Sequence, residues 1–206
     1  MNVALTVDRL TLERGGRRLF ANLSFAALSG QFLELVGPNG AGKTSLLRAL
    51  AGFLPPVDGA ISLSEAGAAI DADQRPTRLH MLGHRDGLKG PLDARAHLSF
   101  WRDLLGGEGG ADFDAVLARV GLARLGDLPT RTFSAGQGRR LALARLLVAP
   151  RPIWLLDEPA AGLDRDGKAL LGEMIADHRR AGGVVIAALH EPLDAAVDST
   201  IAIGAP

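Results

Sequence analysis

The feature that most constrains the fold is a glycine-rich loop between a strand-like run and a helix-like run. FLELV covers residues 32–36 and is followed by GPNGAGKT at residues 37–44. In the next segment, Leu46, Leu47 and Leu50 recur at helical spacing. The loop matches G-x-x-x-x-G-K-[ST], a pattern that is meaningful where it joins a strand to a helix, as it does in this sequence. We therefore expect a strand, a phosphate-binding loop and a helix in that order.

The residue types in this loop suit the binding of a nucleoside triphosphate. Glycine allows successive backbone N–H groups to turn toward a ligand, and the start of the following helix adds partial positive charge. Lys43 can reach the β- and γ-phosphates, and the Thr44 hydroxyl can bind Mg²⁺. The alternative, a turn with an ordinary surface lysine, is disfavoured by the strand-and-helix context. The residues expected to contact nucleotide are Gly37, Pro38, Asn39, Gly40, Ala41, Gly42, Lys43, Thr44 and Ser45.

The rest of the chain alternates strand-like and helix-like segments. Helical patterns cover SAGQGRRLALARLLVAP, which Ser134 can cap and Pro150 ends, and GKALLGEMIADHRR. Buried-strand patterns occur in PIWLLDEP and VVIAALHEP, and each ends in polar residues. This alternation predicts an α/β fold with a largely parallel sheet whose polar strand ends share one edge. Residues 2–28, interrupted at Gly15 and Gly16, predict an antiparallel hairpin.

Length and composition indicate one domain over residues 1–206. The chain is long enough to bury a substantial core, and 47% of its residues are apolar. Residues 92–128 are expected to be mainly helical, with a break at GGEGGAD, and we place a small helical subdomain at about residues 84–135. No apolar run is long enough to cross a bilayer, so we expect any membrane association to depend on a partner.

Composition also argues against several classes of function. Lys and Arg total 23, as do Asp and Glu, so there is no basic field for nucleic acid and we expect no nucleic-acid partner. The chain contains no cysteine, which excludes disulfides, thiol catalysis and thiolate metal sites. The N-terminal residues lack a positive leader followed by an apolar block, so no signal peptide is expected.

A second group of candidate catalytic residues lies at the end of the strand-like run IWLLD. Asp157 ends this apolar run, where it can hold Mg²⁺, usually through water. Glu158 can orient or deprotonate an attacking water molecule. A helix-capping aspartate and a solvated glutamate would explain the pair if it stood alone. Beside a phosphate-binding loop, it supplies the remaining parts of a triphosphatase.

Further segments extend this pattern into a resemblance to the ATP-binding cassette (ABC) family. TFSAGQG is similar to the family's signature motif, AGLD resembles its D-loop, and a histidine after the last buried strand resembles its switch histidine. These motifs cover nearly the whole chain. In the family's order they are Walker A at residues 37–44, the signature at 133–137, Walker B at 153–158, the D-loop at 161–164 and the switch histidine at His190.

The resemblance implies a P-loop NTPase fold of the ABC type. That fold has a mostly parallel core sheet, an N-terminal antiparallel β-subdomain and a small α-helical subdomain. It also implies ATP and Mg²⁺ as ligands, with Thr44 and Asp157 holding the metal ion. Glu158 would be the catalytic base, and His190 would contact the γ-phosphate.

The same resemblance implies a head-to-tail homodimer. In such a dimer, Ser134, Gly136 and Gln137 of one copy would cover the triphosphate held by Lys43 of the other. Physical chemistry agrees, because a serine at a helix N-terminus offers a hydroxyl, backbone N–H groups and the helix dipole to an anion. Each site would then need both chains.

Two residues depart from the family's usual pattern. Many relatives stack adenine on an aromatic ring of the N-terminal hairpin, whereas this region holds Arg14 and the chain has no tyrosine. The Arg14 guanidinium is a candidate to stack on the base in its place. His84 stands where the family's Q-loop glutamine is expected, so it is a candidate Mg²⁺ ligand or a residue of the subunit contact. For His80, His97 and His178 we expect core or capping roles.

One stretch is similar to a particular branch of the family. LGHRDGLKGPLDARAHLSFW resembles the ATP-binding subunit of the haem exporter of cytochrome c maturation, the CcmA family, and RGGRRLF and LLDEPAAGLD agree with it. His97 stands where that branch usually has asparagine, and residues 189–191 read Leu-His-Glu where Thr-His-Gln is common. The resemblance implies a peripheral protein on the cytoplasmic face of the bacterial inner membrane. Its partners would be the integral membrane permease subunits CcmB, with CcmC and CcmD.

Such a protein would couple ATP hydrolysis to haem export or to release of a haem-loaded periplasmic chaperone. Two alternatives stay open: the ATPase subunit of another ABC transporter, and a soluble ABC ATPase such as an iron–sulfur assembly factor. A kinase or GTPase that uses only the glycine loop would leave the Ser134 segment and His190 unexplained.

Overall fold

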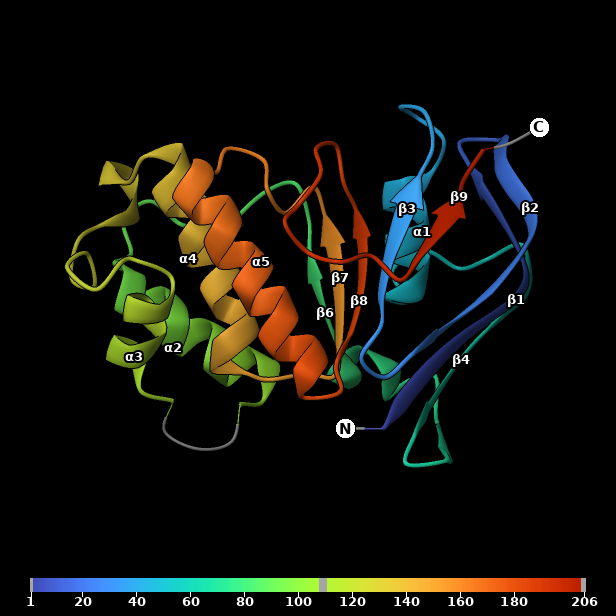
Figure 1. Cartoon of the computed structure of the whole chain (residues 1–206), viewed down its shortest axis with the longest axis horizontal. Helices are drawn as coiled ribbons and strands as arrows, with labels where there is room; N and C mark the ends of the chain where they lie inside the picture. The colour runs from blue at the N-terminus through green and yellow to red at the C-terminus, as the bar shows by residue number, and fades with distance from the viewer. Residues whose placement is uncertain (1, 108–110, 205–206) are drawn as a thin grey trace.

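The computed structural model describes residues 2–107 and 111–204 (Figure 1). Two sheets lie side by side, with a single helix between them and a group of helices on the far side of the second sheet. The antiparallel sheet contains β1 (Val3–Arg14), β2 (Arg17–Leu28), β4 (Asp58–Glu65) and β5 (Ala68–Ile70). The parallel sheet contains β3 (Phe32–Val36), β6 (Leu79–Leu82), β7 (Ile153–Asp157), β8 (Val184–Ala188) and β9 (Ser199–Ala202).

The parallel sheet has the strand order β6-β7-β8-β3-β9. Strands β7 and β8 are central, and every residue in both is buried. Such continuous apolar runs are expected where helices or sheets cover both faces of a parallel sheet. The predicted parallel sheet and both predicted buried strands are therefore confirmed.

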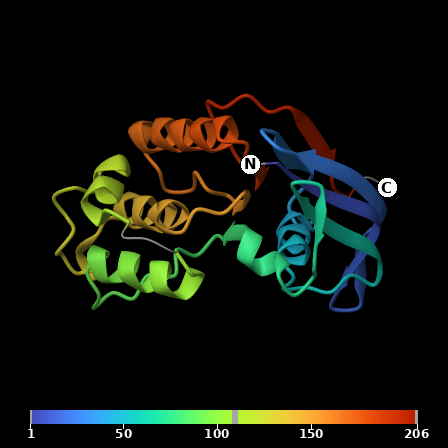
Figure 2. The same cartoon turned by 90° about the horizontal axis from the view of Figure 1, so that it is seen from below.

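Helices cover the parallel sheet on both faces. Helix α1 (Lys43–Leu50) lies between the two sheets, whereas α4 (Ala135–Val148) and α5 (Arg165–Arg180) lie on the opposite face (Figure 1). Helices α2 (Ala94–Leu105) and α3 (Phe113–Arg119) pack against α4, and Figure 2 shows α4 lying between α5 and α2. Short 3₁₀ helices occupy Arg75–Arg78 and Thr130–Thr132.

Side chains of β7 alternate between the two hydrophobic cores. Ile153 and Leu155 pack with α1 and the antiparallel sheet, whereas Trp154 and Leu156 pack with the helices on the other face. This follows from the two-residue period of a strand, because successive side chains point to opposite faces. One strand therefore ties together both halves of the molecule and carries Asp157 at its end.

The N-terminal hairpin forms as predicted. Strands β1 and β2 pair antiparallel around Gly15 and Gly16, whose φ angles of 59° and 75° lie in the left-handed region that glycine adopts without steric cost. The sequence did not indicate β4, which pairs with the other edge of β1, nor β9, which pairs parallel with β3.

The helical region agrees with expectation where the structure describes it. Helices α2 and α3 lie within residues 92–128. The predicted break GGEGGAD covers residues 106–112, of which 108–110 lie outside the described ranges. Helix α4 begins after Ser134 and ends before Pro150, as predicted. No helix in the described ranges combines the length and the apolarity that crossing a bilayer requires.

The histidines that we assigned to the core are buried. The Nε2 atom of His80 lies 2.6 Å from the Ala149 carbonyl oxygen. His97 accepts a hydrogen bond from the Lys89 N–H at Nε2, and its Nδ1 atom lies 2.9 Å from the Asp93 carbonyl oxygen. His178 stacks on Trp154 with ring centroids 3.9 Å apart. The expected structural roles are confirmed.

Two of these histidines predict a loss of stability in acid. Burial lowers the pKa of His80 from 6.5 to about 3 and that of His178 to about 4. At pH values between these pKa values and 6.5, the two imidazoles are protonated in the unfolded chain but not in the folded chain. The free energy of unfolding should therefore fall as pH drops below 6.5, by about 1.4 kcal/mol per pH unit for each histidine.

Urea unfolding at pH 7 and pH 5 checks this prediction. A His80→Gln variant should lose less stability than the wild-type chain over that interval, because glutamine does not titrate there. His190 is exposed, so a His190→Gln variant should lose as much stability as the wild type. Equal losses in all three proteins would contradict the assignment.

Candidate active site

The glycine-rich loop joins the end of β3 to the start of α1. Gly37 has φ 149°, and a Cβ atom there would come within 2.3 Å of the Ile203 carbonyl oxygen, so only glycine fits. The Lys43 ammonium donates to the carbonyl oxygens of Gly37 at 2.5 Å and Pro38 at 3.3 Å. The Lys43 side chain therefore folds over the glycine loop, and its ammonium group contacts the first two residues of that loop.

A buried carboxylate at the end of β7 faces the start of α1. The Thr44 hydroxyl lies 3.0 Å from each carboxylate oxygen of Asp157. Burial raises the pKa of Asp157, and the hydrogen bond from Thr44 opposes that shift. Strands β3 and β7 are separated by β8, so the parallel topology is what brings the glycine loop and this carboxylate to the same edge of the sheet.

Thr44 and Asp157 are suitable for a magnesium ion. Hydroxyl and carboxylate oxygens are the donors that Mg²⁺ prefers, and Mg²⁺ keeps several water or phosphate oxygens among its ligands. Within the described ranges, no group of three or more His, Asp or Glu side chains is placed to hold a metal ion. A cation at Thr44 and Asp157 would therefore be one that completes its shell from water and a bound phosphate, as Mg²⁺ does.

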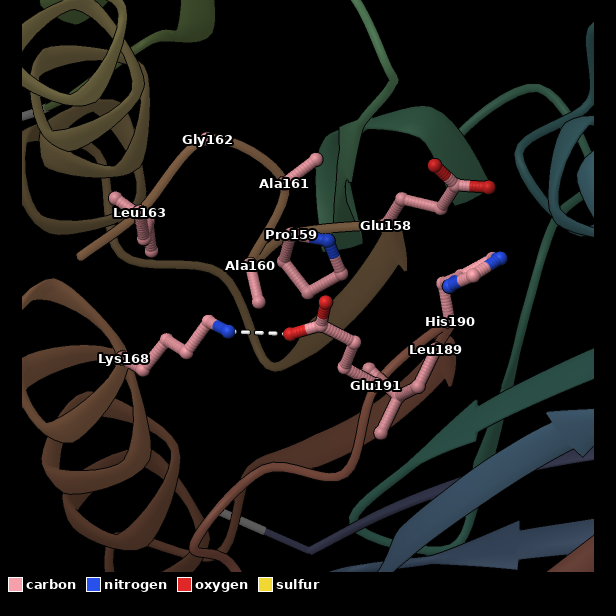
Figure 3. Close-up of a pocket in the computed structure, with 10 residues that line it drawn as sticks. All are labelled: Glu158, Pro159, Ala160, Ala161, Gly162, Leu163, Lys168, Leu189, His190 and Glu191. Carbon is pink, nitrogen blue, oxygen red and sulfur yellow. Dashed lines mark hydrogen bonds and ion pairs between the residues drawn. The ribbon is translucent and has the colours of Figure 1, made fainter. Parts of the chain in front are cut away.

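Glu158 adopts an uncommon backbone conformation directly after β7. Its φ angle is 49°, in the left-handed region that costs a residue with a Cβ atom about 1 kcal/mol or more. Its N–H donates to the Ala188 carbonyl at the end of β8, at 2.9 Å. Figure 3 shows the Glu158 and His190 side chains projecting to the same side, away from the ion pair between Lys168 and Glu191.

A cavity of about 390 Å³ collects most of the predicted nucleotide-binding residues. The glycine loop forms one wall, and the ends of β7 and β8 form another. The hairpin contributes basic side chains, including the predicted Arg14. The lining residues are Arg14, Arg17, Leu19, Pro38, Asn39, Gly40, Ala41, Gly42, Lys43, Thr44, Ser45, Asp157, Glu158, Ala188, Leu189 and His190.

The predicted signature residues lie elsewhere in the chain. Ser134 and Gln137 form a reciprocal cap at the start of α4, in which the Gln137 N–H donates to Ser134 Oγ at 3.2 Å and the Ser134 N–H donates to Gln137 Oε1 at 2.9 Å. Ser134, Gly136 and Gln137 do not line the cavity that holds Lys43. One chain therefore does not bring the two predicted halves of the site together.

His84 is also absent from the cavity lining. Its Nδ1 atom lies 3.6 Å from Glu158 Oε2, and it is exposed. The structure thus places His84 beside the predicted base. A role as a metal ligand stays a prediction.

A second, smaller cavity adjoins the first. Its volume is about 270 Å³, and it lies between the segment after β7 and the segment after β8 (Figure 3). The ion pair between Lys168 of α5 and Glu191 crosses it. The predicted D-loop and switch segments therefore face each other across this space.

Sequence reasoning missed three features of the site. Arg17 and Leu19 line the main cavity, although RGGRRLF held a visible signal in its run of basic residues. Arg139 is buried beneath Glu158, and its charge resembled that of an ordinary residue on an exposed helix face. Nothing in the local pattern distinguishes a buried arginine from a solvated one.

Comparisons with known proteins agree with one another. The protein-family description "ABC transporter" matches residues 20–161. The "Cytochrome c biogenesis ATP-binding export protein CcmA" of Nitrobacter winogradskyi is 49% identical over 189 residues, which cover 92% of each chain. The protein of the same name from Bradyrhizobium diazoefficiens is 50% identical over 189 residues, again 92% of each chain.

Solved structures share the fold. The "ATP binding subunit of ABC transporter" has a TM-score of 0.79 at 23% identity, covering 90% of this chain and 79% of that one. The cbiO1 protein of Clostridium perfringens, part of the ABC transporter complex cbiONQ, has a TM-score of 0.74 at 24% identity, covering 93% and 80%. The predicted fold class is thereby confirmed.

Proposed function

Because the chain belongs to the ABC transporter family, and within it to the CcmA cytochrome c biogenesis export proteins, we propose that it hydrolyses ATP for haem export. The observation that carries the proposal is one cavity lined by Lys43, Thr44, Asp157, Glu158 and His190. These are the groups that phosphoryl transfer to water requires: a phosphate cradle, oxygen ligands for a metal ion, a base and a γ-phosphate contact.

The triphosphate would rest on the N–H groups of the glycine loop at the start of α1. Lys43 would leave the carbonyl oxygens of Gly37 and Pro38 and turn to the β- and γ-phosphates. Thr44 and Asp157 would hold Mg²⁺, which neutralises phosphate charge when bound. The Arg14 guanidinium would stack on the adenine ring.

Glu158 would accept a proton from the attacking water. Glu158 lines the nucleotide cavity at the end of β7, and its carboxylate projects to the same side as His190 (Figure 3). His190 would orient the γ-phosphate from the end of the neighbouring strand β8. Oriented groups of this kind accelerate hydrolysis because the reacting atoms are already positioned.

Two copies would form each complete site. Ser134, Gly136 and Gln137 stand at the exposed start of α4 and contribute nothing to the cavity of their own chain. In a head-to-tail dimer they would cover the γ-phosphate held by the other copy. ATP would then favour the closed dimer because it binds that state more tightly, and hydrolysis would release it.

The proposed setting is the cytoplasmic face of the inner membrane. The partners would be the permease subunits CcmB, with CcmC and CcmD, and the helical subdomain at about residues 84–135 would transmit closure of the dimer to them. The work done would be haem export or release of the haem-loaded periplasmic chaperone.

Deletion of the gene tests this function in the organism that carries it. We expect c-type cytochromes with covalently bound haem, measured by haem staining, to disappear while b-type haem is unchanged. A wild-type copy should restore them, and a Lys43→Ala copy should not. Normal c-type cytochromes after deletion, with a defect in another transport process or in iron–sulfur enzymes, would contradict the haem-export assignment.

A further inference from the structure

A buried cation connects three segments near the predicted base. Arg139 lies on α4 and is 2% exposed. Its guanidinium donates to main-chain carbonyl groups on two sides and to one carboxylate. The acceptors are the carbonyl oxygens of Gly83 (3.0 Å), Asp157 (3.3 Å), Glu158 (2.7 Å) and Pro159 (3.0 Å), and Oδ1 of Asp86 (2.9 Å).

The contact with Arg139 involves the backbone of Glu158 and of both its neighbours. The left-handed backbone of Glu158, with φ 49°, carries a steric cost that the surrounding structure must offset. The Ala188 carbonyl holds the Glu158 N–H, and Arg139 holds the Glu158 carbonyl oxygen by its shortest hydrogen bond. Arg139 also holds both flanking carbonyl groups, at Asp157 and Pro159. The Ala161 N–H also donates to the Glu158 carbonyl oxygen, at 3.1 Å, so the backbone at Glu158 is held by Arg139, by strand β8 and by the turn that follows β7.

The same guanidinium fixes the segment that carries His84. Gly83 and Asp86, on either side of His84, are both hydrogen-bonded to Arg139. At Gly138 an added Cβ atom would lie 3.3 Å from Leu88 Cδ1, so this segment rests directly on α4. The ion pair with Asp86 compensates the buried charge of Arg139, which would otherwise be costly.

We propose that Arg139 is a positioning residue, which holds Glu158 in the orientation for hydrolysis and links it to residues 83–86 and to the start of α4. This inference rests on the proposed role of Glu158 as the base. Arg139 lies five positions beyond Ser134 on the same helix. Movement of α4 when Ser134 meets a triphosphate, or movement of residues 83–86, therefore reaches Glu158 through one side chain.

Steady-state kinetics of the Arg139→Gln chain tests the proposal. We expect kcat for ATP hydrolysis to fall by about 10-fold or more, within the ~10²-fold range that small misplacements of reacting groups produce. KM for ATP should stay within about 2-fold of the wild-type value, because Arg139 does not line the nucleotide cavity. A loss confined to kcat would identify an effect on orientation rather than on binding.

Arg151 offers a matched control. It also donates to several carbonyl oxygens, those of Pro76, Leu79 and Leu105, but it lies away from the cavity. An Arg151→Gln chain should lose thermal stability as Arg139→Gln does, yet keep its kcat. If both variants kept wild-type kcat, or if both lost kcat equally, Arg139 would be a structural residue only and the proposal would be overturned.

Asp86→Asn provides a second route if Arg139→Gln does not fold. It leaves the arginine in place but removes its charged partner, and Arg139→Lys keeps the charge but removes the fork of donors. Both should lower kcat at unchanged KM, and the Asp86→Asn, Arg139→Lys double variant should be no slower than the slower single variant. Additive losses, or wild-type kcat in both single variants, would count against the link.

The Glu158→Gln chain separates the two levels of inference. If Glu158→Gln hydrolyses ATP normally, the proposed base is wrong and the role of Arg139 falls with it. If Glu158→Gln is inactive while Arg139→Gln behaves like Arg151→Gln, the proposed function stands and only the role of Arg139 is overturned.

Discussion

Replacement of Glu158 by glutamine is expected to lower kcat for ATP hydrolysis by about 10²–10⁴-fold, the range typical of a lost general base. Glutamine keeps the size and the hydrogen-bonding reach of the side chain, but it does not accept a proton from water. The glycine loop, Lys43 and Thr44 are unaffected, so the affinity for ATP should stay within about 2-fold of the wild-type value. Release of inorganic phosphate and binding of a fluorescent ATP analogue measure the two quantities.

Glu191 supplies the control for this experiment. It is an exposed carboxylate near Glu158, it lines the smaller cavity, and it is paired with Lys168 (Figure 3). A Glu191→Gln chain should keep most of its kcat. Near-normal turnover by Glu158→Gln, or an equal loss in both variants, would remove Glu158 from the role of base.

A mixture of two inactive variants is expected to regain activity. Lys43→Ala removes the phosphate contact of one half-site. Ser134→Asp preserves the helix cap, because aspartate is as good an N-cap as serine, but sets a negative charge against the triphosphate. Each variant alone should be inactive. In a head-to-tail dimer of one of each, the second chain's Lys43 and the first chain's Ser134 form one intact site.

The size of the recovery can be derived from symmetry. Random pairing at equal concentrations makes half of the dimers mixed, and each mixed dimer has one intact site of two, so about a quarter of wild-type activity is expected. Mixing Lys43→Ala with Glu158→Gln is the control. Lys43 and Glu158 of one chain belong to the same site, so each site of a mixed dimer carries one of the two changes and no intact site arises. An inactive first mixture, or a fully active Ser134→Asp chain, would exclude the composite site.

The sequence predicted the parts of the fold that depend on local pattern. Strands β3, β7 and β8 were recognised as short apolar runs, and helices α1, α4 and α5 as longer segments with helical patterns; Ser134, Gly37 or a proline marks several of their ends. Strands β4 and β9 have few buried residues, and they are held by pairing with segments distant in the chain. Local pattern carries no information about such pairing.

The candidate site shows the same division. Lys43, Thr44, Asp157 and Glu158 were predicted because each belongs to a motif whose chemistry is visible in the sequence, and the topology then brings them to one cavity. The environment of Arg139 was not predictable, because burial of a charge depends on carbonyl groups from two other segments. The direction of the Glu158 side chain likewise depends on its φ angle of 49°, which cannot be predicted from the residue type.

The reciprocal cap at the start of α4 has a consequence for how the serine meets an anion. The Ser134 oxygen accepts one hydrogen bond, from the Gln137 N–H, and this contact orders the side chain while its O–H stays available to donate to an anion. In the proposed dimer, the entropy of ordering this side chain would be lost when the helix forms rather than when the second chain binds, so less of it would oppose the association.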